Sequence, residues 1–138
     1  MEKKYYGRVT KKLSAIVASE DGLRLKVMAV DTAGDSVSIL CNIYQRDTIT
    51  PGGSFIRDGK PVELTLSLFL PDDEHQSAPI TARCHIAYSR RISIEQCMIG
   101  LRYIDFEQDG RSRLFRFINA AMTNSNTGNF AESPSFCT

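Results

Sequence analysis

Apolar and polar residues alternate with a period of two in six separate segments, and this pattern constrains the fold more than any other feature of the chain. Each segment has one apolar and one polar face, as expected for antiparallel strands that cover a core on one side. Closing six such strands into a barrel removes the exposed edges that an open sheet would leave. The predicted strands are residues 13–17, 23–29, 37–43, 62–70, 82–88 and 99–103.

Turn-forming residues separate these strands. Asp21-Gly22 predicts a tight hairpin between the first two strands. A longer loop is predicted from Tyr44 to Lys60, because turn-forming residues recur at 51–53 (Pro-Gly-Gly) and 58–61 (Asp-Gly-Lys-Pro). The sequence therefore predicts a mostly β domain whose strands are joined by turns and one long loop.

The period changes after Glu107, where apolar residues recur at i, i+3, i+4 and i+7. This spacing predicts one amphipathic helix from about Asp109 to Thr123, which should cover an opening of the barrel with its apolar face. That face consists of Leu114, Phe117, Ile118 and Ala121.

The residues at the two ends of the chain predict segments outside the barrel. The end that follows the helix is rich in Asn, Ser and Thr and can bury little surface, so we expect it to be flexible. The predicted organisation is a basic arm at residues 1–10, a barrel with its helix at 11–123, and a flexible tail at 124–138.

Charge and cysteine content exclude several functional classes. The 138 residues carry a net charge of +1, which does not favour a nucleic acid polymer as partner. No apolar run approaches the roughly 20 residues of a membrane span, and no signal peptide follows the N-terminal lysines, so we expect no membrane insertion. None of the four cysteines forms a C-x-x-C pair, which predicts reduced thiols and a cytoplasmic location. They are Cys41, Cys84, Cys97 and Cys137.

The sequence offers no catalytic or metal-binding arrangement. His75 lies beside acidic residues, but no second histidine stands at ligand spacing, so a solvated loop is the better interpretation. Gly52-Gly53-Ser54 lacks the Lys-Ser/Thr of a phosphate-binding loop. We therefore expect that the protein is not an enzyme and needs no metal or cofactor.

Three C-terminal segments together resemble a known family. Residues 84–91 (Cys-His-Ile-Ala-Tyr-Ser-Arg-Arg) precede a Gly-aliphatic-x-aromatic strand at residues 99–106, and Leu114-Phe115-Arg116-Phe117-Ile118 follows it. This order resembles the second half of a PilZ domain, and the resemblance extends over residues 3 to 122. It implies a six-stranded antiparallel β-barrel of the split-barrel type with one C-terminal α-helix. It also implies a bacterial receptor for cyclic di-GMP.

PilZ domains bind this ligand through two signatures, an R-x-x-x-R arm and a D/N-x-S-x-x-G turn. The arm signature falls on residues 4–8, where Arg8 matches the second arginine and Lys4, with Lys3 beside it, replaces the first. The turn signature falls on residues 31–36, where Asp31 matches and Ser36 replaces the glycine. The resemblance implies a ligand site made by Lys4, Arg8, Asp31, Lys3 and Ser36.

The departures from these signatures predict weak or absent binding. Lys4 cannot make the bidentate contact with guanine that arginine makes. Ala33 replaces the signature serine, and losing a hydrogen bond to a charged group costs about 1.5–3 kcal/mol, or roughly one to two decades in affinity. Ser36 adds a Cβ where the family has none, and Asp35 adds a carboxylate that disfavours a bis-phosphate ligand.

Plainer interpretations remain open for the same residues. Lys3, Lys4 and Arg8 fit a solubilising basic terminus as well as they fit a ligand site. Asp31 equally fits a turn in which its side chain accepts a hydrogen bond from the backbone. Two functions follow from the resemblance. One is a non-catalytic signalling module that binds cyclic di-GMP weakly and relays it to an unidentified protein partner. The other is a ligand-independent adaptor of PilZ fold in type IV pilus or motility regulation.

Overall fold

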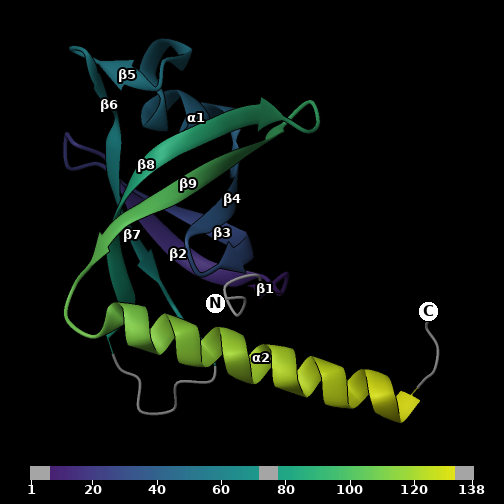
Figure 1. The fold of residues 1–138 in the computed structure, drawn as a ribbon. Coiled ribbons are helices and arrows are strands. Elements are labelled where there is room, and N and C mark those ends of the chain that lie inside the picture. Colours follow the sequence, from purple (N-terminus) through teal and green to yellow (C-terminus); the bar gives the residue numbers. More distant parts are fainter. Residues whose placement is uncertain (1–6, 72–77, 133–138) are drawn as a thin grey trace.

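Six strands of the main sheet close into a barrel. The computed structural model describes residues 7–71 and 78–132, and Figure 1 shows the barrel with a long helix beneath it. The elements are β1 (Arg8–Val9), β2 (Leu13–Ala18), β3 (Arg24–Ala33), β4 (Ser36–Asn42), α1 (Ile43–Ile49), η2 (Pro51–Gly53), β5 (Ile56–Arg57), β6 (Lys60–Pro61), β7 (Glu63–Leu68), β8 (Ile80–Arg91), β9 (Gln96–Phe106) and α2 (Gly110–Glu132).

The barrel closes between strands that follow each other in the chain. The strand order is β1-β3-β2-β7-β8-β9-β4, and a further antiparallel pairing of β3 with β4 joins the two ends. The six predicted strands correspond to β2, β3, β4, β7, β8 and β9. β1 is an additional strand, which pairs with β3 through Arg8 and Ala33 and through Val9 and Thr32. The predicted mostly β, six-stranded barrel with a C-terminal helix is confirmed.

The alternating apolar residues fill the barrel. In β7 every second residue is buried, as the alternation predicts. The hairpin between β2 and β3 is also confirmed, since Gly22 has a φ of 91° and donates its N–H to the carbonyl oxygen of Ser19. The largest fully buried side chains include Leu13, Val17, Val37, Ile39, Leu64, Leu66, Leu68, Ile99, Leu101 and Leu114.

Bulges interrupt the alternation in two strands that matter for the site. The pairing of β3 with β4 shifts between Ala29 and Asp31, and the pairing of β8 with β9 shifts between Ile86 and Tyr88. One extra residue reverses which side chains face inward. Ile86 is buried, whereas the side chain of Tyr88 is 38% exposed. The simple alternation that placed Tyr88 on the apolar face was therefore wrong.

The helix α2 lies across one end of the barrel, next to β8 and β1 (Figure 1). Leu114 and Ile118 are buried, and Phe117 and Ala121 pack against the core, so the predicted apolar face is confirmed. The helix continues to Glu132, past its predicted end at Thr123, and thus includes part of the predicted tail. Tail residues 133–138 lie outside the described part of the chain.

The predicted loop from Tyr44 to Lys60 contains regular structure. The side chain of Asn42 accepts a hydrogen bond from the N–H of Gln45, whose side chain accepts one from the N–H of Asn42, and this capping box starts α1. Farther along, β5 and β6 form a small hairpin around Asp58 and Gly59, which both have positive φ. The loop prediction overlooked both signals.

Three cysteines in the described part of the chain are free and buried. Cys41 and Cys97 are directly opposite on β4 and β9, and Cys84 lies on β8. Burial raises the pKa of Cys41 to about 11 and that of Cys84 to about 12. Cys137 lies outside the described residues. Among the helices within 7–71 and 78–132, none is long and apolar enough to cross a membrane.

Candidate ligand site

Arg8 and Asp31 form a bidentate ion pair on the outside of the barrel. Arg8 Nε donates to Asp31 Oδ1 and Arg8 Nη2 to Asp31 Oδ2, both at 2.8 Å. The pairing of β1 with β3 positions the two side chains, because Arg8 stands opposite Ala33 in the ladder. The structure therefore brings together one residue of each predicted signature.

The pair is accessible to solvent. The side chains of Arg8 and Asp31 are 60% and 29% exposed, so water screens their attraction, and such pairs contribute at most about 1 kcal/mol to stability. The hydrogen bonds to Asp31, and then its charge, raise the pKa of Arg8 above its ordinary value. Two of the five N–H donors of a guanidinium suffice for this pairing, so the group keeps donors for an anion.

The other predicted site residues do not join this pair in the described part of the chain. Lys3 and Lys4 lie outside the described residues. Ser36, at the start of β4, donates its hydroxyl to Asp35 Oδ1 at 3.3 Å. Asp35 also lies near enough to Arg8 for its charge to raise the pKa of Arg8.

The predicted turn is shorter than its signature. Asp31 and Ala33 still belong to β3, and Ser36 already belongs to β4, so only Gly34 and Asp35 make the bend. A Cβ at Gly34 would come within 2.8 Å of the ring of Phe115 on α2. The glycine in this bend therefore allows the helix to pack closely against the barrel.

A row of polar and aromatic residues continues from Asp31 across three more strands. Asp31 on β3 is opposite Ser38 on β4, Ser38 is opposite Gly100 on β9, and Gly100 is opposite Tyr88 on β8. The hydroxyl groups of Tyr88 and Ser38 are 2.8 Å apart and hydrogen-bonded. The tyrosine reaches across β9 because Gly100 has no side chain, and a Cβ there would overlap its ring.

Arginines lie at both ends of this row. The guanidinium carbon of Arg90 is 5.9 Å from the centre of the Tyr88 ring. At the other end, Arg8 lies close enough to Tyr88 that the ionised form of the Tyr88 hydroxyl contributes, after Asp31, to the raised pKa of Arg8. We define the outer row as Arg8, Asp31, Ser38, Tyr88 and Arg90.

Sequence reasoning found Arg8 and Asp31 but missed the rest of the outer row. Regular alternation grouped Tyr88 with buried residues, and only the bulge after Ile86 turns its side chain outward. A signal was present in Gly100, because a glycine inside a strand often marks a close approach by a neighbouring group.

The outer row offers chemistry for binding an anionic, aromatic ligand. It combines guanidinium groups, which pair with phosphates, with an exposed aromatic ring that can stack on a base. Within the residues that the structure describes, no group of three or more His, Cys, Asp or Glu side chains could hold a metal ion. His75 lies outside these residues, and His85 is half-exposed, with Nε2 3.8 Å from Glu63 Oε2.

Sequence comparisons find no relatives, whereas comparison with solved structures does. No protein-family model and no curated protein matches the chain. The inhibitor of motility MotI/DgrA of Bacillus subtilis is 15% identical, with a TM-score of 0.64, and the match covers 90% of this chain and 53% of that one. K. pneumonia MrkH is 10% identical, with a TM-score of 0.67, and the coverages are 94% and 53%. The chain thus spans about half the length of these two proteins.

A third structure has nearly the same length as this chain. It is the PilZ domain of YcgR from Escherichia coli with c-di-GMP, which is 8% identical with a TM-score of 0.58. The match covers 93% of this chain and 97% of that domain. At such low identity the likeness concerns the backbone. Together with the closed barrel, the added β1 strand and the C-terminal helix, it shows that this chain has the fold of PilZ domains.

Proposed function

We propose that the protein is a non-catalytic signalling module that binds cyclic di-GMP at the outer row, weakly, and relays it through protein contacts. One observation supports this most. Arg8 and Asp31 come from the two segments that resemble the PilZ signatures, and they meet in a bidentate pair on a fold shared with c-di-GMP-bound YcgR. The module would work in the cytoplasm.

The outer row suggests how the ligand is held. The remaining donors of Arg8 face a phosphate, and Lys3 and Lys4 add positive charge from the arm. Tyr88 offers one ring face to a guanine, and stacking of a base on an aromatic side chain contributes about 1–3 kcal/mol. Its hydrogen bond to Ser38 orients the ring before the ligand arrives.

Weak affinity follows from groups that the site lacks or has already engaged. Ala33 has no hydroxyl, and the hydroxyl of Ser36 is bonded to Asp35. The Asp31 carboxylate is bonded to Arg8, so a guanine that approaches it must share or displace that pair. Asp35 places another negative charge near the phosphates.

Calorimetric titration of the purified protein with cyclic di-GMP tests this proposal. We expect binding that Arg8→Ala and Asp31→Ala each weaken by about tenfold or more, since each removes a charged partner. Arg24→Ala, at the other end of β3, serves as the matched control and should leave the affinity unchanged. Absence of heat at high micromolar ligand would exclude the receptor function.

The second candidate is a ligand-independent adaptor of the same fold, in type IV pilus or motility regulation. It is favoured by the ion pair itself, because Arg8 and Asp31 satisfy each other without any ligand. In that case Arg8→Ala and Asp31→Ala leave the binding of the partner protein unchanged in a pull-down. Loss of the partner in both variants would favour the receptor instead.

A further inference from the structure

An open groove of about 820 Å³ lies on the outside of β2, β3 and β4, apart from the outer row. Its floor is apolar and is made by Ile16, Met28, Leu40 and Phe69. Two of these large apolar residues are more than a third exposed, Met28 at 37% and Phe69 at 39%. None of the five outer-row residues lines the groove.

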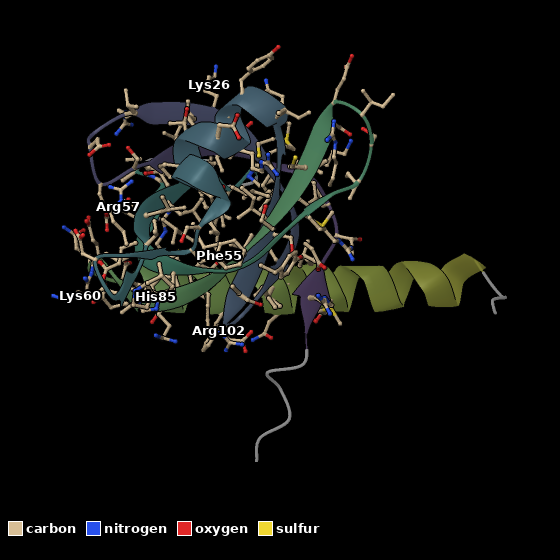
Figure 2. The ribbon with its side chains drawn as sticks, turned by 90° about the horizontal axis from the view of Figure 1, so that it is seen from above. Lys26, Phe55, Arg57, Lys60, His85 and Arg102 are labelled. Carbon is tan, nitrogen blue, oxygen red and sulfur yellow. The ribbon has the colours of Figure 1, made fainter. Side chains whose placement is uncertain are left out.

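Among the described residues, the charged side chains that line the groove are Lys12 and Lys26. In the described part of the chain neither lysine takes part in an ion pair, and no carboxylate lines the groove to neutralise them. Figure 2 shows Lys26 pointing outward from the barrel beside α1. The groove therefore presents an apolar floor with uncompensated positive charge at its rim.

Strand pairing and capping hold the groove in shape. Met28 is opposite Ser14 on β2 and opposite Leu40 on β4, so three hydrogen-bonded strands support the floor. The N–H of Phe69 donates to the carbonyl oxygen of Ser14 at 3.0 Å. At the α1 end of the groove, Gln45 Nε2 donates to the carbonyl oxygen of Lys26 at 2.9 Å. This hydrogen bond holds α1 next to β3.

We propose that this groove docks an acidic amphipathic helix of a partner protein. The proposal deepens the relay part of the proposed function, on which it rests, by giving the partner a place and a chemistry. The apolar floor receives apolar side chains at i, i+3, i+4 and i+7 of the helix. Lys12 and Lys26 pair with carboxylates on the flanks of the helix and select against basic partners.

The closed barrel limits the alternatives. A partner strand cannot extend the sheet beside Met28 and Leu40, because Met28 is paired with Ser14 on β2 and with Leu40 on β4, and Leu40 is also paired with Met98 on β9. A partner therefore has to bind here through its side chains. An open groove across three strands can receive the apolar face of an amphipathic helix. The groove and the outer row are both on β3, with the bulge between Ala29 and Asp31 separating them.

The test uses peptides, since the groove can be probed before the partner is identified. A displayed peptide library is selected against the full chain, and the enriched peptide is synthesised with a fluorescent label for anisotropy titration. We expect enriched peptides with Asp or Glu beside a helical apolar stripe. Lys12→Gln with Lys26→Gln should weaken binding about tenfold, as expected for two exposed ion pairs, and should flatten its salt dependence.

Two single variants complete the comparison. Met28→Ser removes part of the floor and should also weaken binding, whereas Lys11→Gln is the matched control, because Lys11 is exposed and does not line the groove. The proposal is overturned if the enriched peptides are basic or uncharged, or if the double lysine variant binds as tightly as the native protein.

Competition separates this proposal from the proposed function. If cyclic di-GMP displaces the peptide even from the Arg8→Ala variant, the groove is a nucleotide site and the docking proposal fails. If sedimentation shows a dimer that the lysine variants dissociate, the occupant is a second copy and the proposal also fails. If the peptide binds as expected while cyclic di-GMP gives no heat, the receptor function fails and the docking groove stands.

Discussion

Gly100 on β9 provides the space in which the ring of Tyr88 on β8 lies, and a Cβ at position 100 would overlap that ring. The contact allows the Tyr88 hydroxyl to reach Ser38 at 2.8 Å and to extend the row that begins at Asp31. Because the ring is partly exposed, it can leave this position when it is crowded.

Gly100→Ala should therefore displace Tyr88 and break its hydrogen bond to Ser38. We expect a loss of about 1 kcal/mol in the free energy of unfolding, measured by urea denaturation. In a Tyr88→Ala background the same change should be neutral or stabilising, since alanine is better than glycine inside a strand. Equal effects in both backgrounds would contradict the contact.

The Arg8–Asp31 pair should make a small, salt-sensitive contribution to stability. A double-mutant cycle with Arg8→Gln and Asp31→Asn should give a coupling energy of about 0.2–1 kcal/mol, because both side chains are accessible to water. The coupling should decrease as salt is raised to about 1 M, where the screening length is near 3 Å. A coupling that is unaffected by salt would argue against an exposed pair.

The buried thiols should resist modification in the folded protein. Burial raises the pKa of Cys41 to about 11 and that of Cys84 to about 12, so both remain protonated at pH 8 and lack the reactive thiolate. In a Cys137→Ser variant, an aromatic disulfide reagent should therefore label no thiol until urea unfolds the chain. Rapid labelling of the native variant would disprove this packing.

Asp105 should titrate below its ordinary value of 3.8. Arg83 donates to both carboxylate oxygens, at 3.2 and 2.7 Å, and the hydrogen bonding lowers the pKa of Asp105. Because the folded pKa is depressed, the contribution to stability is present above the unfolded value and is lost as the pH falls through the folded one. Carboxyl NMR titration measures the midpoint, and Arg83→Gln should bring it back up.

Local patterns were sufficient for most of the architecture. Alternation identified six strands, and helical spacing identified the apolar face of α2, since both periodicities follow from backbone geometry alone. The end of α2 was misplaced because the prediction relied on the poor helix propensity of Asn, Ser, Thr and Gly, and propensity is a weak guide to where a helix ends. α1 was missed because its signal, the reciprocal caps of Asn42 and Gln45, is not a periodic one.

The sequence by itself determined the barrel strands and the apolar face of the helix, and its resemblance to a known family singled out Arg8 and Asp31 as candidate ligand residues in two separate segments. Only the tertiary structure decided that β1 joins β3 and thereby pairs these two side chains. It also decided that a bulge turns Tyr88 outward and that a groove forms beside Lys12 and Lys26. The physical reason is that periodicity is a property of neighbours in the chain. Bulges, cross-strand rows and grooves instead depend on which strands lie side by side after the barrel closes.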